Sequence, residues 1–199
     1  MKGRTLKRRN PLPHPTQSFE DMLRAFFPDF LDLIEPGLIE RLELELVAFP
    51  RPEDLAGWPE EELCDLGLLA EVMTRRGRWL TILVQVEIGT GDRQALEERL
   101  LGSYLRLSLE GRQPARMVVI HLQGGRPGIH LEWIVDEADG EELLRVPYLS
   151  FGLAECRAED YLAKPHPLAW ALAALMRPSE RSLAEHRDFC LRRIAGCAC

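Results

Sequence analysis

The sequence predicts an α/β fold in which a mixed β-sheet is flanked by helices. Three observations indicate this class. Residues 79–90 form a β-branched, apolar run with the length of a buried strand, and residues 64–73 have the pattern of a partner strand across a short basic turn. Residues 92–110 have the periodicity of a long helix, and a second apolar run follows at 115–121. The apolar stripe expected on this helix consists of Leu96, Leu100, Leu101, Tyr104, Leu105 and Leu107. Strand, helix and strand in this order form a parallel pair, so a sheet that also contains the hairpin is mixed.

The residues of the run 79–90 alternate between two faces of the predicted sheet. A carboxylate in an otherwise apolar strand is costly unless it is paired. Glu87 therefore marks its own face as the candidate functional face. One face carries Leu80, Ile82, Val84, Val86 and Ile88, and the other carries Thr81, Leu83, Gln85, Glu87 and Gly89.

The register of the hairpin can be derived from its turn. A loop of three or five residues centred on Arg76 pairs Met73 with Trp79, and the same register places Asp65 opposite Glu87. Directly opposed residues have Cβ atoms about 4.5 to 5.5 Å apart, which is close enough for two carboxylates to bind one divalent cation. A loop of even length would put the two acids on opposite faces. Two solvated acids on a wet sheet face are the alternative interpretation.

Length, composition and charge predict one acidic domain with a basic extension. With 199 residues, 46% of them hydrophobic, the chain can bury a core, and we expect one α/β domain over 18–195. A basic, disordered arm (1–17) precedes it and a frayed tail (196–199) follows it. The net charge is −7 although the arm is rich in lysine and arginine, so the domain itself is strongly acidic. This charge argues against broad electrostatic DNA binding, and the arm either contacts phosphate groups or stays in solvent.

Several classes of protein are disfavoured by what the sequence lacks. The longest apolar run, 167–176, is about half a membrane span, and five cysteines without paired spacing indicate reduced thiols. We therefore expect a soluble, cytoplasmic protein. The sequence has no Gly-rich phosphate loop, no Ser-centred nucleophile motif and no His-pair zinc motif, which disfavours kinases, serine hydrolases and zinc proteases. Asp65 and Glu87 remain the candidate chemistry.

The other elements follow from periodicity and turn residues. A helix begins at a plausible N-cap, Ser18, and breaks or kinks before Pro28. The segment 40–49 predicts a strand with one wet face, and the stretch 50–62 predicts a loop. The expected buried face of this strand carries Leu42, Leu44 and Leu46, and the wet face carries Glu43, Glu45 and Val47. His121 falls in a predicted strand and is expected to have a structural role. Further strands are expected within 128–136 and 143–153, and closing helices within 158–164, 167–176 and 180–196.

Six segments, taken in order over roughly residues 18–177, resemble the PD-(D/E)XK nuclease superfamily. More narrowly, they resemble its Rpn or YhgA-like group of putative transposases, the recombination-promoting nucleases. The resemblance implies a restriction-endonuclease-like fold, a Mg²⁺ (or Mn²⁺) cofactor and hydrolysis of phosphodiester bonds in DNA. It leaves a homodimer open as an assembly. The segments are FEDMLRAFFPDFLDLIEPGL, CDLGLLAEV, ILVQVEIG, LEERLLGSYLRL, ARMVVIHL and HPLAWALAALM.

The resemblance assigns roles to three residues of the hairpin. Asp65 falls on the motif aspartate, and Glu87 falls on the acidic residue of the (D/E)XK motif. Both would bind the metal through their carboxylates, and the backbone carbonyl of Ile88 would be a third oxygen ligand.

One position departs from the family pattern. Gly89 stands where this group usually has Gln and many other members of the fold have Lys. A side chain there is expected to orient the attacking water and to offset charge on the phosphate, and glycine does neither. Gln85, on the face of Glu87, and Arg99, on the following helix, are candidate substitutes. Three interpretations stay open: a working nuclease, a nuclease fold that serves as a binding or regulatory module, or an unrelated α/β domain.

Overall fold

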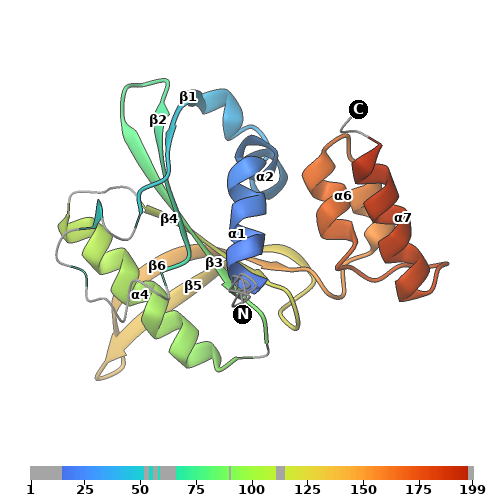
Figure 1. Ribbon diagram of the computed structural model, residues 1–199. Coiled ribbons are helices and arrows are strands. Elements are labelled where there is room, and N and C mark those ends of the chain that lie inside the picture. The colour runs from blue at the N-terminus through green and yellow to red at the C-terminus, as the bar shows by residue number, and fades with distance from the viewer. Residues whose placement is uncertain are drawn as a thin grey trace, which may run out of the picture.

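A six-stranded mixed sheet with helices on both faces forms the core of the protein (Figure 1). The computed structural model describes residues 15–51, 54–55, 58, 66–89, 91–110 and 115–196. The strand order is β1-β2-β3-β4-β6-β5, which confirms the predicted α/β class with a mixed sheet. The strands are β1 (Leu42–Ala48), β2 (Leu68–Thr74), β3 (Trp79–Glu87), β4 (Ala115–His121), β5 (Gly128–Ala138) and β6 (Glu141–Gly152).

Both parallel and antiparallel pairs occur in this sheet. β1, β2 and β3 pair antiparallel, β3, β4 and β6 pair parallel, and β5 adds antiparallel to β6. The parallel addition of β4 to β3 was expected from the helix between them. The helices are α1 (Pro15–Ala25), α2 (Phe27–Ile34), α4 (Arg93–Leu109), α5 (Ala158–Leu162), α6 (Pro167–Ala173) and α7 (Leu183–Ala195), with a 3-10 turn η1 (Ile39–Arg41).

The N-terminal helix breaks where the sequence predicts, ahead of Pro28. α1 ends at Ala25, and α2 begins at Phe27 with Pro28 in its first turn, where a missing N–H costs no helical hydrogen bond. The predicted N-cap is wrong, because α1 begins at Pro15 and Ser18 lies inside the helix. Proline fits this early position since its fixed φ is already helical. Residues 1–14 of the expected basic arm lie outside the described residues.

The β2–β3 hairpin has the register that its turn predicts. Met73 pairs with Trp79 and Leu68 pairs with Val84. Both the amide and the hydroxyl of Thr74 donate to the carbonyl of Arg78, each at 2.8 Å, and so close the turn. The described pairs of this ladder extend no further than Leu68.

Gly67, just before β2, approaches the backbone of β3 closely. Gly67 has φ +76, and a Cβ at this position would lie 2.4 Å from the Val84 carbonyl oxygen. Only glycine takes up this combination of a left-handed φ and close backbone approach without strain. Asp65 lies outside the described residues, so its predicted pairing with Glu87 stays a prediction.

β1 departs from the simple alternation that the sequence indicates. Its register against β2 shifts between Glu43 and Val47, and a bulge of this kind moves the following side chains to the other face. Leu46, expected on the buried face, is 48% exposed, whereas Val47, expected on the wet face, packs against the core.

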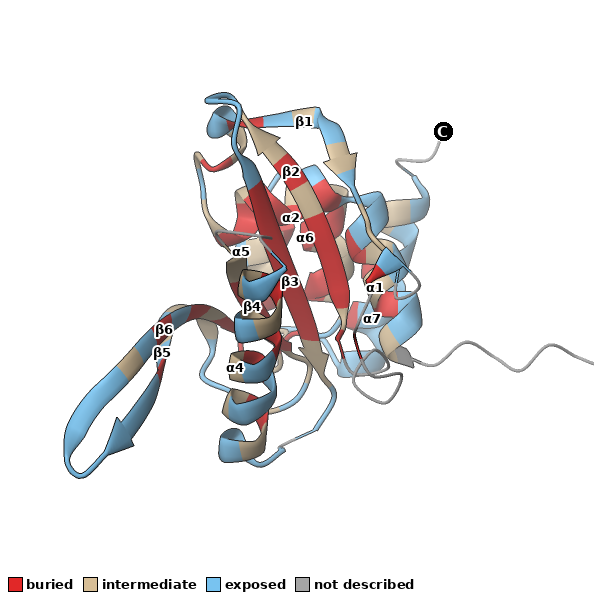
Figure 2. Cartoon of the chain, turned by 90° about the vertical axis from the view of Figure 1, so that its left-hand side faces the viewer, coloured by how far each residue is buried: buried red, intermediate tan, exposed pale blue. Residues whose placement is uncertain are grey.

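Two apolar layers lie on the two faces of the sheet. The Leu80, Ile82 and Val84 face packs with α1, α2 and α6, as the alternation of β3 predicts. The opposite face, which includes Leu83, packs with α4. In Figure 2, α4 lies in front of the sheet and the other helices lie behind it.

Helix α4 is the crossover that connects β3 to β4. Its N-cap is Asp92, whose carboxylate accepts a hydrogen bond from the Gln94 amide at 3.0 Å. Leu96 and Leu100 are buried, as predicted, but Leu105 is 45% exposed. The predicted stripe was too broad, because the sheet covers only one side of this helix.

The C-terminal helices close the α2 side of the molecule, which confirms the prediction for 158–196. His166, the N-cap of α6, lies 3.6 Å from the Asp29 carboxylate and 3.3 Å from that of Asp32, both on α2. α7 begins with a capping box formed by Ser182 and Glu185. Within the described ranges, no helix is long and apolar enough to cross a membrane.

Candidate functional site

A pocket of about 260 Å³ lies where β3 and β4 end, on the face of the sheet that α4 covers. Glu87 ends β3 and His121 ends β4, and the two residues are in register across the parallel pair. The N-terminus of α4 and the adjoining parts of β5 and β6 complete the lining. The carboxyl ends of parallel strands are the usual ligand-binding edge of such sheets, so this pocket is the candidate site.

Glu87 is held by two contacts from other elements. One oxygen of its carboxylate, Oε1, accepts a hydrogen bond from Nη2 of Arg99 on α4 at 2.6 Å. Its backbone carbonyl accepts from the Leu122 amide at 2.8 Å. The Glu87 side chain is 22% exposed, so this charge-assisted contact is partly shielded from water. Arg99, a candidate from the sequence, therefore does reach Glu87.

His121 lies beside Glu87 with a neutral imidazole. Burial lowers the pKa of His121, and the nearby charges of Glu87 and Glu132 oppose that effect. Gly125 lies directly against the ring, because a Cβ there would be 2.9 Å from the His121 Cγ. A neutral histidine can accept or donate a hydrogen bond in this pocket.

The same pocket contains a protonated tyrosine and two arginines in different environments. Burial is the main cause that raises the pKa of Tyr148, so its hydroxyl stays protonated near neutral pH. Arg93 donates to Glu97 at 2.7 Å and to Glu132 at 3.3 Å. Arg126, in contrast, is exposed and forms no ion pair with any described residue. An anion that enters the pocket would therefore meet Arg126 as its available cation.

Only some of the site residues predicted from the sequence line this pocket. Glu87 and Gly89 both line it. Gln85 shares the face of Glu87, but it is buried (2% exposed) and is not among the lining residues. Ile88 lies beyond the end of β3 with 37% of its surface exposed, and it does not line the pocket either. Asp65 lies outside the described residues.

Gly89 occupies open space beside Glu87. A Cβ built on Gly89 has no described heavy atom within 4 Å, and its φ lies outside the left-handed region. The backbone therefore accepts a larger side chain at the position where the family pattern has Gln or Lys. Because Gly89 lines the pocket, such a side chain would be attached to the pocket wall.

The sequence did not identify His121, Arg126 and Tyr148 as site residues. A signal for His121 was present in the sequence. In a strand–helix–strand unit the carboxyl ends of both strands meet at one edge of the sheet. Glu87 ends the first strand and His121 ends the second, so the two residues lie side by side. For Tyr148 no such signal existed, because its place depends on β6 inserting between β4 and β5.

The described residues do not complete a divalent-cation site on their own. Among them, no three His, Cys, Asp or Glu side chains are close enough together to hold a metal ion. Glu87 offers one carboxylate, and the other lining glutamate, Glu132, contacts Arg93. Asp65, which the resemblance gives as the second carboxylate ligand, lies outside the described ranges.

Comparisons of the chain with models of known families, with curated proteins and with solved structures found no match.

Proposed function

We propose that the protein is a Mg²⁺- or Mn²⁺-dependent DNA endonuclease that hydrolyses phosphodiester bonds, of the PD-(D/E)XK type. The observation that carries the proposal is the position of Glu87, a carboxylate at the end of the central strand β3 and on the wall of a pocket. An acid in this position can take part in binding a cation or a water molecule. Arg126 on the same wall can bind a phosphate.

The order of the elements also supports this proposal. The antiparallel β1–β2–β3 unit, the crossover helix α4 and the parallel strand β4 form the arrangement that the resemblance implies. Among the described residues, Cys156 and Cys190 are buried free thiols, in keeping with the cytoplasmic location that we propose. DNA is the proposed partner.

The residues of the pocket would act on the substrate in separate ways. Arg126 would donate to the phosphate oxygens, and Tyr148 would donate a hydrogen bond because its hydroxyl stays protonated. Arg99 would orient the carboxylate of Glu87 through their 2.6 Å contact. A divalent cation, when bound, stabilises negative charge that develops on a phosphate. In this proposal Asp65 is the second carboxylate, as the resemblance implies.

A second candidate function is a catalytically inactive nuclease-fold module that binds or regulates. Two observations favour it. Gly89 provides no side chain to assist the reaction, and the Glu87 carboxylate is already neutralised by Arg99 at 2.6 Å. A guanidinium in this contact competes with a cation for the same oxygen. The experiment must therefore separate metal binding from cleavage.

Metal binding is tested by isothermal titration of the full chain with Mn²⁺ and Mg²⁺. We expect Asp65→Ala and Glu87→Ala each to weaken binding by at least about tenfold, or roughly 1.4 kcal/mol, because each removes a carboxylate ligand. The matched control is Glu98→Ala, which removes an exposed acid of α4 that contacts Gln94. Equal affinity in wild type, Asp65→Ala and Glu87→Ala would contradict the proposed metal site.

Cleavage is tested by plasmid nicking with the same proteins and with two variants of Gly89. We expect slow Mg²⁺- or Mn²⁺-dependent nicking by the wild type, none by Glu87→Ala, and faster nicking by Gly89→Lys or Gly89→Gln. The open space at Gly89 makes these substitutions compatible with the fold. Folded, metal-bound protein that never nicks DNA, in wild type or either Gly89 variant, would favour the binding module instead.

A further inference from the structure

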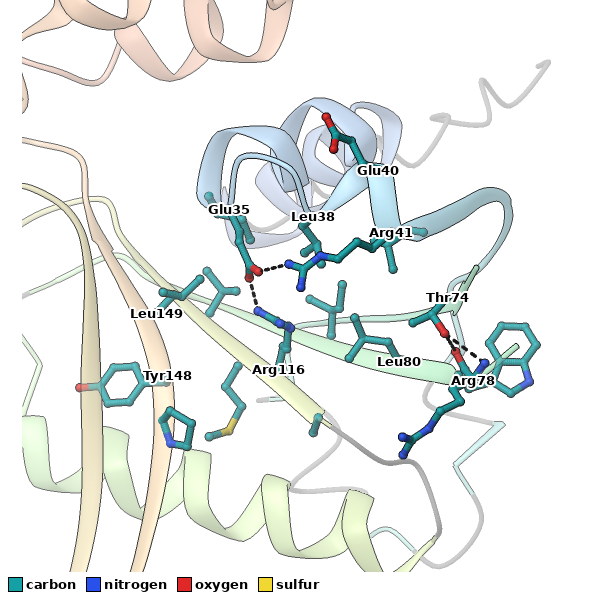
Figure 3. Close-up of a pocket in the computed structure, with 18 of the residues that line it drawn as sticks. Glu35, Leu38, Glu40, Arg41, Thr74, Arg78, Leu80, Arg116, Tyr148 and Leu149 are labelled. Carbon is teal, nitrogen blue, oxygen red and sulfur yellow. Dashed lines mark hydrogen bonds and ion pairs between the residues drawn. The ribbon is translucent and has the colours of Figure 1, made fainter. Parts of the chain in front are cut away.

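A second and larger groove, about 740 Å³ in volume, opens on the face of the sheet opposite α4 (Figure 3). Its floor is apolar and includes Leu80, Ile82 and Leu149, and the end of α2 with η1 forms one wall. Trp79 lies at the rim and is 50% exposed. The helices that bury the rest of this face leave this end of it uncovered. An exposed apolar floor of this kind is a candidate surface for association.

The rim of the groove is basic. Arg41 and Arg116 both donate to the Glu35 carboxylate, Arg41 at 2.6 Å, so these three charges largely satisfy one another. The arginine turn, which we define as Arg75, Arg76 and Arg78 between β2 and β3, is different. All three side chains are exposed, and none forms an ion pair with a described residue. The rim therefore presents, next to an apolar floor, three cations that no described residue neutralises.

The β5–β6 hairpin has the complementary properties. Its far end extends away from the body of the protein and is exposed (Figure 2). On the face that continues from the groove, Leu131 is 58% exposed and Trp133 is 41% exposed. Leu131 also lines the groove, so this stripe and the groove are one continuous surface. The acidic tip, which we define by its exposed side chains, consists of Asp136, Glu137, Asp139, Glu141 and Glu142.

We propose that this surface is the interface of a homodimer, in which the acidic tip of each copy contacts the arginine turn of the other. The arginine turn lines the groove, and the acidic tip ends the hairpin whose apolar stripe continues from that groove. In Figure 1 the turn projects at the upper left and the tip at the lower left. A two-fold rotation therefore places each beside its counterpart, as a self-complementary interface requires. The apolar stripe of one copy then packs in the groove of the other. This proposal is independent of the proposed nuclease activity.

The charge pattern selects a second copy as the occupant. A partner with the same charge at either end would be repelled, whereas a second copy of this chain brings the opposite charge to each end. Arg145, on the same hairpin, contacts Glu142 at 3.2 Å and lies 5.3 Å from the Trp133 ring centroid. This single arginine does not balance the five acidic side chains of the tip, which therefore keeps an excess of negative charge. Burying the exposed leucine and tryptophan side chains supplies the attraction, and the charges fix the orientation.

The test is a charge exchange followed by sedimentation velocity on the full chain, over about 1 to 100 µM protein. We expect a wild-type dimer that weakens as salt increases, since exposed charges are screened. Reversing the arginine turn to glutamate should weaken association by at least about tenfold, and so should reversing Glu137, Glu141 and Glu142 to lysine. The control Arg187→Glu changes an exposed charge on α7 and should leave the dimer unchanged.

Mixing the two reversed variants is the decisive step. In the mixed dimer the acidic tip of one copy meets the retained arginine turn of the other, and the basic tip meets the acidic turn, so both contacts are restored. We expect a heterodimer with near wild-type affinity. A monomeric wild type over the whole concentration range would overturn the proposal, as would a dimer that survives both reversals or a mixture that stays monomeric. All substituted side chains are exposed, and thermal melts check that the variants fold.

Discussion

Gly67 is the residue whose replacement the structure predicts to be most informative, because it precedes β2 and leads back toward Asp65. An alanine at this position would have to adopt φ +76, which costs an L-residue about 1 to 2 kcal/mol. Its Cβ would also lie 2.4 Å from the Val84 carbonyl oxygen and 3.3 Å from the Gln85 Cα. Both are backbone atoms of β3, which is held on both sides by neighbouring strands, so relief requires a shift of the strand pairing. Such overpacking costs about 1 to 3 kcal/mol.

We therefore expect Gly67→Ala to lower the free energy of unfolding by about 2 to 5 kcal/mol. Gly89→Ala is the matched control, because its Cβ meets no described heavy atom within 4 Å and the φ of Gly89 lies outside the left-handed region. Its effect should stay within about 0.5 kcal/mol. Urea denaturation followed by circular dichroism measures both changes. For a chain of this size, 2 kcal/mol corresponds to roughly 4 to 8 °C in Tm. Wild-type stability of Gly67→Ala would refute the close approach of Gly67 to β3.

Two further predictions concern pH and helix capping. Burial lowers the folded-state pKa of His121 below its ordinary 6.5. As pH falls below about 6.5, the unfolded chain therefore binds a proton at this histidine before the folded chain does, and the free energy of unfolding decreases. His121→Gln should therefore make stability decline less steeply between pH 7 and 5 in urea titrations, and an unchanged slope would contradict the stated cause. Ser182→Ala removes the acceptor for the Glu185 amide and the donor to its carboxylate at 2.7 Å. We expect a loss of about 0.5 to 2 kcal/mol in thermal unfolding, whereas no loss would mean that solvent replaces the capping box at no cost.

The hairpin and the crossover could be predicted because their signals are local. A turn of odd length between 73 and 79 fixes which residues pair, and the helical repeat of 92–110 requires a crossover and hence a parallel strand. The contact between Arg99 and Glu87 was also within reach of this reasoning. α4 follows β3 directly and packs on the face that carries Glu87, so its side chains were candidates from the start.

The features that escaped prediction depend on partners distant in the sequence. The bulge in β1 exchanges the faces on which Leu46 and Val47 lie, and it arises in the pairing of β1 with β2. The alternation of residues 42–48 gives no signal for it. The neighbours of Glu87 from β5 and β6 depend on β6 adding to β4 before β5 does. The start of α1 at Pro15 was missed for a local reason. Both Pro15 and Ser18 are good signals for a helix start, and the sequence alone does not choose between them.

The position of β3 in the sheet has a consequence for how the chain is made. β3 is buried from Leu80 to Gln85 and pairs with β2 on one side and with β4 on the other. As the chain leaves the ribosome, β2 precedes β3, but β4 follows only after the whole of α4. During that interval one edge of an apolar strand has open hydrogen-bonding groups, which is the condition under which strands pair with other chains. A nascent or truncated chain that ends within α4 should therefore aggregate or depend on a chaperone, whereas one that extends past β4 has that edge covered.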